Sequence, residues 1–445
     1  MSPQAAFWIA TVIFILAYAL IVSEKIHKTI VALSGAALMI VLGIATQEEA
    51  FHSPELGVDW NVIFLLFSMM VIINIMRPTG IFEYIAIKSA KFARGKPFMI
   101  MVVFSVVTAV LSAFLDNVTT VILIAPVTLF ICEALELDVV PYLITEALAS
   151  NIGGTATLIG DPPNIMIASK ASLDFMAFLN NLAPVVVIIV IVYVITLKFI
   201  FGKKLTVKEN LRRRVMAMDE NEAIKDPVLI KKSLFVLAIT MTGFVLHGML
   251  HMEPATIALF GAATLLLISR IKEPHHILSE VEWTTLFFFI GLFIIIGGVV
   301  KVGLIGLMSV KVLELTQGNL FATSMVVMWF SAFASAFIDN IPYVATMNPL
   351  IIDMARQLWP DLQGTALLHH PDLMPLWWSL ALGACLGGNG TAIGASANVI
   401  VVGMAEKMGR PISFKRFMLY GMPLMIESVI IATLYVWLRY YVLHI

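Results

Sequence analysis

The sequence predicts an all-α polytopic membrane protein with the inverted-repeat architecture of a secondary transporter. Of the 445 residues, 60% are hydrophobic and 13% are charged, whereas soluble domains contain about 25% charged residues. Apolar runs close to the roughly 20 residues that a membrane-spanning helix needs recur along the whole chain. Polar, Gly-rich motifs interrupt these runs at corresponding places in the two halves, which is the sequence pattern of a transporter's binding site.

The apolar segments predict about 10 transmembrane helices plus two opposed re-entrant hairpins and two broken helices. Four segments are too long for one simple crossing: the hairpin segments 97–136 and 320–358 and the broken-helix segments 141–175 and 375–408. The remaining crossings are expected at about 6–22, 29–46, 61–79, 183–202, 231–250, 254–270, 284–301 and 417–441.

The positions of Lys and Arg predict the topology, because these residues concentrate in short cytoplasmic loops. The basic segments that should lie inside are 25–28, 88–96, 203–232 and 410–416. The segment 48–59 is acidic and should lie outside. The basic segments before and after 97–136 can both lie inside only if this segment enters and leaves the membrane from the cytoplasmic side. Both termini then lie on the outer side of the cytoplasmic membrane. Three basic residues also fall outside on this topology: Lys301, Lys311 and Arg356.

An internal repeat relates the two halves. Asp116-Asn117 recurs 223 positions later as Asp339-Asn340, and the Gly-rich stretch 151–164 recurs 234 positions later, up to Asn398. Each half contains about five crossings, and an odd number makes the halves antiparallel, so the first hairpin opens inward and the second outward. The predicted units are a first repeat at 1–202, a cytoplasmic linker at 203–230 and a second, inverted repeat at 231–445.

Hairpin tips and helix breaks expose free helix ends, whose N–H and C=O groups can bind a small solute. Glycines in the breaks let the backbone approach the solute closely, and Asn and Thr supply neutral donors and acceptors. The residues predicted to bind substrate are Asn117, Thr119, Thr120, Asn151, Gly153, Gly154, Thr155, Thr157, Asn164, Asn340, Gly388, Asn389, Thr391 and Asn398.

Four acidic residues at membrane depth are predicted to carry the coupling proton or cation, because an intramembrane carboxylate is costly and indicates function. They are Asp116, Asp339, Asp161 and Glu146. The structural alternative is that Asp116 and Asp339 cap the second arms of their hairpins and that Asp161 caps the helix that follows it. No Lys or Arg is expected near either tip, which favours a neutral solute or a cation over a multivalent anion.

The sequence gives no indication of a cofactor, a metal site or a catalytic group. Cys132 and Cys385 form no metal-binding motif, and buried thiols usually serve as small apolar residues. Cys385 borders the second Gly-rich stretch, so a soft ligand is the alternative reading. The net charge of −1 does not suggest nucleic acid as a partner. Since the sequence contains no nucleotide-binding loop, an ATP-driven pump would require a separate subunit.

The motif Asp116-Asn117-Val118-Thr119-Thr120, followed by the stretch 151–164, resembles the ion transporter superfamily. This superfamily includes ArsB-type arsenite/antimonite permeases, NhaD-type sodium–proton antiporters, the melanosomal P protein and dicarboxylate transporters. The dicarboxylate branch has Ser-Asn-Thr at its hairpin tips, whereas this chain has Asp-Asn-Val and Asp-Asn-Ile-Pro, so the chain looks most like the ArsB/NhaD/P-protein group. The resemblance covers essentially the whole chain.

The resemblance implies a scaffold and a mobile transport domain, often in a homodimer, with the site at the hairpin tips and breaks. For an ArsB-type permease it also implies association with an arsenite-activated ATPase subunit. We therefore expect a proton-coupled exporter of arsenite or antimonite. Arsenite is largely a neutral trihydroxide near pH 7, which suits a cradle of Asn, Thr and backbone groups. The alternatives are a sodium–proton antiporter that uses the same aspartates, and a channel or passive anion pathway.

Overall fold

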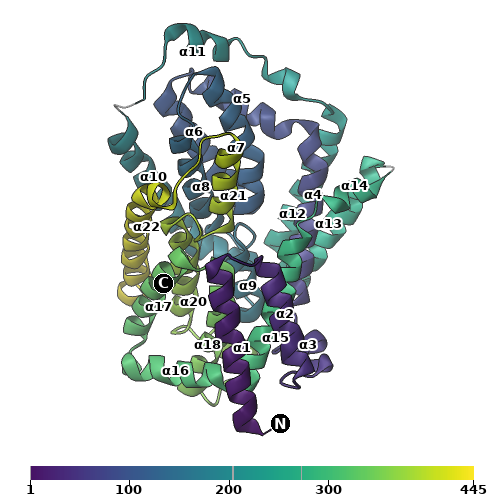
Figure 1. Ribbon diagram of the computed structural model, residues 1–445, viewed down its shortest axis with the longest axis vertical. Coiled ribbons are helices and arrows are strands. Elements are labelled where there is room, and N and C mark those ends of the chain that lie inside the picture. The colour runs from purple at the N-terminus through teal and green to yellow at the C-terminus, as the bar shows by residue number, and fades with distance from the viewer. Residues whose placement is uncertain (1, 203–204, 272, 445) are drawn as a thin grey trace.

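The computed structural model describes residues 2–202, 205–271 and 273–444, and it confirms the all-helical fold, with no strand in these ranges. The predicted linker begins with Lys203 and Lys204, which lie outside the described residues. Figure 1 shows an elongated bundle with the linker helix α11 at one end and α3, α16 and the N-terminus toward the other.

The first half contains ten α-helices and one short 3-10 helix. They are α1 Pro3–Ser23, α2 Lys28–Val41, α3 Gln47–His52, α4 Trp60–Met76, η1 Arg77–Thr79, α5 Ile81–Phe92, α6 Pro97–Ser112, α7 Asn117–Ala134, α8 Val140–Gly154, α9 Pro162–Ala171 and α10 Phe175–Phe201. The linker carries α11 Glu209–Met216 and η2 Glu220–Ala223.

The second half repeats this order. Its elements are α12 Pro227–Leu250, α13 Pro254–Ser269, α14 Pro274–Ser279, α15 Trp283–Lys301, α16 Leu304–Leu315, α17 Leu320–Phe337, α18 Asn340–Leu358, α19 Gly364–Leu368, α20 Met374–Gly387, η3 Gly388–Gly390, α21 Ser396–Lys407, α22 Phe414–Val436 and the π-helical turn η4 Trp437–Val442.

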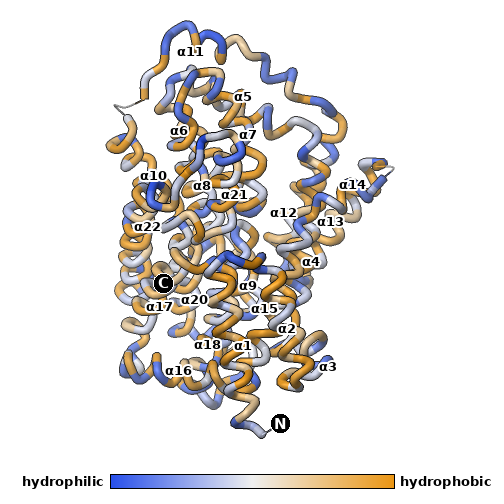
Figure 2. The backbone as a smooth tube through the Cα atoms, viewed as in Figure 1, coloured by the Kyte–Doolittle hydropathy of each residue, from blue (hydrophilic) through white to orange (hydrophobic). Residues whose placement is uncertain are grey.

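Eight helices in the described ranges are long and apolar enough to cross a membrane. Two of them, α7 and α17, are arms of hairpins, so they do not cross by themselves. The crossings α2 and α13 are shorter than the usual span, and two further crossings are divided between α8 and α9 and between α20 and α21. Figure 2 shows these helices as largely hydrophobic, whereas the linker around α11 is hydrophilic.

The two hairpins enter the bundle from opposite ends, as the loop charges predict. In Figure 1, α6 and α7 lie in the half of the bundle nearest the linker, whereas α17 and α18 lie in the other half. Each broken helix packs on its own hairpin, α8 on α6 and α20 on α17, and each also contacts the other half, through α9 on α18 and α21 on α7. The tips and the breaks therefore meet near the middle of the molecule.

Two helices that the hydropathy pattern did not predict follow the third crossing of each repeat, α4 in the first and α15 in the second. α5 begins after Gly80 and α16 begins after Gly303, and these glycines adopt φ of 82° and 86°. Positive φ is readily adopted only by glycine, so the repeated glycine sets the same sharp turn in both halves. The two helices were missed because each is short and carries charged residues.

Small residues let the broken helices approach the hairpins. A Cβ added at Gly153 would lie 2.0 Å from the carbonyl oxygen of Ala109, and one added at Gly387 would lie 2.5 Å from the carbonyl oxygen of Ala332. Both clashes involve backbone atoms, which cannot move aside cheaply. The same close helix–hairpin contact is therefore built twice.

Gly153→Ala should lower the stability of the bundle by about 1–3 kcal/mol, the usual cost of overpacking a tight contact. Gly403→Ala in α21 is the matched control, because an added Cβ there meets no atom within 4 Å. Thermal unfolding in detergent should show a lower Tm for Gly153→Ala only. Equal melting of the two variants would contradict the close packing.

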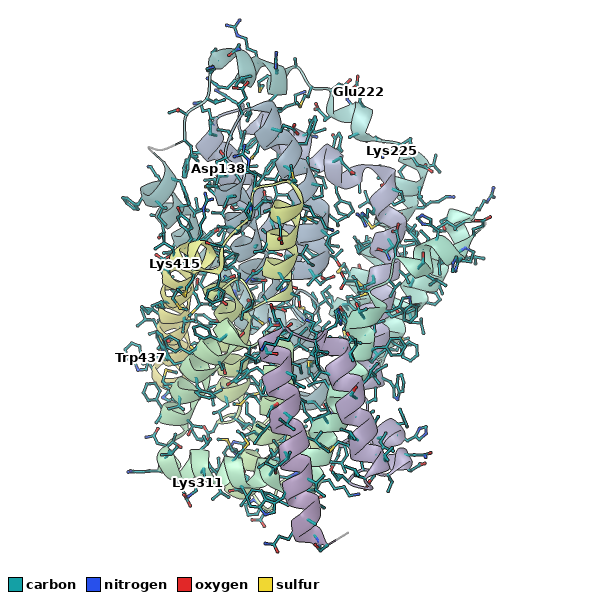
Figure 3. The ribbon with its side chains drawn as sticks, in the orientation of Figure 1. Asp138, Glu222, Lys225, Lys311, Lys415 and Trp437 are labelled. Carbon is teal, nitrogen blue, oxygen red and sulfur yellow. The ribbon has the colours of Figure 1, made fainter. Side chains whose placement is uncertain are left out.

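The basic residues that the topology places outside pair with acids. Lys301 lies 2.7 Å from Glu49 and Arg356 lies 3.3 Å from Glu55, both in the acidic segment, and Lys311 pairs with Glu314 at 2.7 Å. Figure 3 shows Lys311 at the opposite end of the molecule from Glu222 in the linker. These basic residues therefore lie at the end predicted to be outside.

Lys301 lowers the pKa of Glu49 by donating a hydrogen bond to its carboxylate. Because the folded-state pKa of Glu49 is lowered, the pair stabilises the protein at pH values above the pKa of Glu49 in the unfolded chain. This stabilisation is lost as the pH falls through the folded-state pKa. The pair is partly exposed, so Lys301→Met should cost less than about 1 kcal/mol at pH 7 and a smaller amount near pH 3, as protonation of Glu49 begins to remove the pair. Melting curves at the two pH values test this, and an equal loss at both would refute it.

Candidate substrate and ion site

The candidate site lies where four helix ends meet. The first hairpin, α6 with α7, is called the inner hairpin, and the second, α17 with α18, the outer hairpin. The inner hairpin contributes the start of α7 and the outer hairpin the start of α18. The two breaks contribute residues 155–161 and 388–395. All of the predicted substrate-binding residues except Thr119 are buried. The structure thus brings residues from four distant parts of the sequence into one polar centre.

Asn151 is the hub of this centre. Its Oδ1 accepts a hydrogen bond from Nδ2 of Asn117 at 3.0 Å. Its Nδ2 donates to Oδ1 of Asn389 at 2.9 Å and to Oδ1 of Asn398 at 3.0 Å. The amide of one repeat is therefore bound to two amides of the other, and the cluster carries no net charge.

Two repeat-related asparagines hold the backbone of the breaks. Nδ2 of Asn164 donates to the carbonyls of Thr155 and Thr157, at 3.2 and 2.9 Å. Nδ2 of Asn398 donates to the carbonyls of Gly388 and Thr391, at 2.8 and 2.9 Å. These bonds satisfy carbonyls that the end of a helix leaves free, so both side chains shape the breaks as well as lining the centre.

The threonines of the breaks fasten them to the hairpin tips. The hydroxyl of Thr157 donates to the carbonyl of Ala113 at 2.5 Å, and that of Thr391 donates to the carbonyl of Ala336 in the corresponding way. Thr155 bonds back to the carbonyl of Asn151. Of the remaining predicted binders, Thr120 has a buried hydroxyl without a hydrogen-bond partner among the described residues.

Asp116 caps the second arm of the inner hairpin, as the structural alternative predicts. Its Oδ1 accepts the backbone N–H of Thr119 at 2.8 Å. Its φ of 112° is rare for any residue other than glycine, and such strain clusters at functional sites. Asp339 caps the outer hairpin through the N–H of Ile341 at 3.1 Å without this strain. The two tips are therefore related but not equivalent.

The structural alternative for Asp161, that it caps the helix after it, is wrong. Its side chain makes no capping bond to α9. Instead both carboxylate oxygens lie 3.3 Å from Nδ2 of Asn340, at the tip of the outer hairpin. The helix starts without this cap because Pro162 and Pro163 occupy its first turn, where proline leaves no N–H to satisfy.

The expectation that no Lys or Arg lies near either tip is also wrong. Nζ of Lys28 lies 2.6 Å from Oδ2 of Asp339 and 3.1 Å from the hydroxyl of Ser396. Lys28 is 311 positions from Asp339 in the sequence. A lysine between two apolar segments is also what a short cytoplasmic loop would contain. The sequence therefore contained no local signal for this ion pair.

A cavity of about 330 Å³ opens between the two hairpin tips. It is lined by Asp116 and Asp339, by Val118, Pro162 and Ser396 beside the tips and breaks, and by the turn between α1 and α2. The asparagine cluster does not line it, so in this conformation the amides lie behind the carboxylates. The charged groups that line the cavity are Glu24, Lys28, Asp116, Glu282 and Asp339.

Comparison with known proteins identifies the family. Residues 18–383 match the citrate transporter family CitMHS. The chain belongs to this family. An uncharacterized transporter of Mycobacterium tuberculosis is 47% identical over 435 residues, 98% of this chain and 99% of that protein. The P protein of Homo sapiens is 33% identical over 516 residues, covering 98% of this chain and 60% of that protein.

A solved structure supports the fold. The YdaH transporter of Alcanivorax borkumensis superposes with a TM-score of 0.56 over 98% of both chains, at 12% sequence identity. The chain is thus a polytopic helical membrane transporter of the CitMHS family. The P protein belongs to the group that the hairpin motifs resemble, whereas the arsenite-permease part of that resemblance remains a proposal.

Two other predicted residues of this CitMHS transporter lie beside the centre. Glu146 is buried between α7 and α8, where its Oε1 accepts a hydrogen bond from the hydroxyl of Thr128 at 2.5 Å. It lies five residues before Asn151, roughly 7–8 Å along the helix, and is not part of the cluster. Cys385 occupies the position that Asn151 holds in the first repeat, and its Sγ lies 3.5 Å from Oδ1 of Asn164.

Proposed function

We propose that this CitMHS transporter is a proton-coupled secondary transporter that exports arsenite or antimonite across the cytoplasmic membrane. The observation that carries the proposal is the acidic cavity between the hairpin tips, next to an uncharged amide cluster. Arsenite and antimonite are small, polyhydroxylated and mostly neutral near pH 7. Their hydroxyl groups suit the Asn and Thr donors and acceptors of the breaks.

The charge of the cavity argues against a multivalent anion as the solute. Four carboxylates line it, and its lysine is already paired with one of them. Citrate, the solute in the family's name, carries several negative charges near neutral pH and would be repelled by these groups. A neutral solute avoids this penalty, and Asp116 or Asp161 can then carry the coupling proton.

Everted vesicles that contain the full chain test the proposal. With an acidic lumen, so that the proton-motive force drives protons out of the vesicle, they should accumulate arsenite in exchange for protons, and dissipation of the pH gradient should abolish the accumulation. Excess antimonite should compete and excess citrate should not. Vesicles with the Gly403→Ala protein serve as the matched active control. Absence of gradient-dependent arsenite accumulation in vesicles that contain folded protein would refute the proposal.

The same carboxylates support a second candidate, sodium–proton antiport, because carboxylate and hydroxyl oxygens are suitable ligands for a hard cation. In proteoliposomes loaded with a pH dye, an antiporter would give Na⁺-dependent proton release without arsenite. A channel would instead carry current that persists when Asp116 and Asp339 are both replaced by Asn. These two outcomes separate the three candidates.

A further inference from the structure

The two hairpin tips differ in charge although the repeat relates them. Asp339 forms an ion pair with Lys28, whereas Asp116 makes no ion pair among the described residues. Asp161 in the first break instead contacts Asn340 beside Asp339, and the corresponding position in the second break is Ala395. The inner half-site, at Asp116, therefore has a carboxylate without an ion pair among the described residues, and the outer half-site, at Asp339, has a carboxylate paired with a lysine.

Lys28 reaches the tip from a separate element. It is the first residue of α2, which packs on α15, and Figure 2 shows the turn before it as a hydrophilic spot at mid-height in the bundle. Its ammonium also lies 5.0 Å from the centre of the Phe288 ring on α15. The face of the Phe288 ring attracts the ammonium and holds it toward the cavity.

The ammonium sits where a bound cation would sit. It shares Oδ2 of Asp339 with the hydroxyl of Ser396, which lies 3.2 Å from the same oxygen. One carboxylate and one hydroxyl are ligands that a monovalent cation would use, and Lys28 already satisfies both. The side chains are 29% and 12% exposed for Lys28 and Asp339, so the pair lies at the wall of the cavity and a small ion can reach it.

We propose that Lys28 is a tethered cation that permanently fills the outer half-site at Asp339, so that the inner tip residue Asp116, and not Asp339, exchanges a proton or cation. The charged groups that face the pair from neighbouring elements are Glu282 before α15, Glu24 and His27 in the turn before α2, and Asp116 across the cavity. This inference deepens the proposed function by assigning its coupling to one half-site, and its test requires no transported solute.

The test measures Na⁺-dependent stabilisation of the detergent-solubilised full chain. Lys28→Met exposes the carboxylate of Asp339, so NaCl should raise the Tm of this variant by about 2 °C or more beyond any rise seen in the wild type. Choline chloride at equal ionic strength corrects for screening. Lys25→Met, which removes an exposed lysine from the same turn, is the matched control and should behave as the wild type.

Two further variants keep the test decisive if Lys28→Met is poorly stable. Asp339→Asn leaves Lys28 without its partner and should lower the Tm, and Lys28→Met/Asp339→Asn should recover it and show no added response to Na⁺. A double variant that is no more stable than Asp339→Asn, or a Lys28→Met protein that responds to Na⁺ as the wild type does, would overturn the inference. If the wild type does not transport arsenite but Lys28→Met still shows the added response to Na⁺, the proposed substrate is refuted and the inference about Lys28 stands.

Discussion

Asp116→Asn is expected to abolish proton-driven accumulation and to leave the fold intact. The amide oxygen of Asn can still accept the N–H of Thr119, so the helix cap is retained at a cost of a few tenths of a kcal/mol. The amide cannot exchange a proton, however, and the coupling that depends on ionisation is lost. Gradient-driven uptake of arsenite should therefore fall to the level of vesicles without the protein.

Vesicle uptake and Tm, measured together, separate the two roles of this residue. Asp226→Asn is the matched control, because Asp226 caps α12 in the linker in the same manner, through the N–H groups of Val228 and Leu229. It should retain uptake. If Asp116→Asn transports normally and only Asp116→Ala fails, the carboxylate acts as a cap and not as a proton carrier.

Asn151→Ala should be the most destabilising single change in the centre. It leaves Nδ2 of Asn117 and the Oδ1 atoms of Asn389 and Asn398 without this partner, all of them in buried residues. An unsatisfied buried polar group costs about 1–3 kcal/mol, so the loss should exceed about 2 kcal/mol even if one amide finds another partner. With an unfolding entropy of about 2.1 cal/mol/K per residue, this loss should lower the Tm of the 445-residue chain by about 2 °C or more.

Cys385→Ala is the matched control for Asn151→Ala. The repeat places Cys385 at the equivalent position, equally buried, but its thiol is a weaker hydrogen-bonding group than an amide and lies 3.5 Å from Oδ1 of Asn164. Its Tm should change by less than half as much. Equal losses for the two variants would show that the site depends on packing at this position and not on the amide network.

Much of this arrangement could be predicted because its signals are local. Gly153 and Gly154 indicate a helix break, Pro162 indicates where the helix restarts, and loop charges distinguish a hairpin from a crossing. The depth of the amides behind the cavity could not be predicted in this way, because it depends on how α7 and α21 pack against each other. Sequence position gives the helix on which a residue lies but not the residues of other helices that face it.

The errors have the same origin. A lysine between two apolar runs usually marks a cytoplasmic loop, so the sequence predicts this place for Lys28. Only the assembled bundle brings Lys28 to Asp339. The alternative that Asp161 caps its own helix fails for the same reason, because its partner Asn340 is 179 positions away. Glu146 stays a predicted coupling residue, and its side chain faces Thr128 on α7.

The bonds between the breaks suggest how such a chain could arise. Asn151 binds Asn398 of the second half, and the equivalent Cys385 contacts Asn164, the equivalent residue of the first half. These are the reciprocal contacts of two identical subunits packed antiparallel across a twofold axis, each completing the polar centre of the other. A single half would therefore not contain a complete centre. The ancestral unit would have worked as an antiparallel pair, and joining the copies allowed one amide to become a thiol without altering its counterpart.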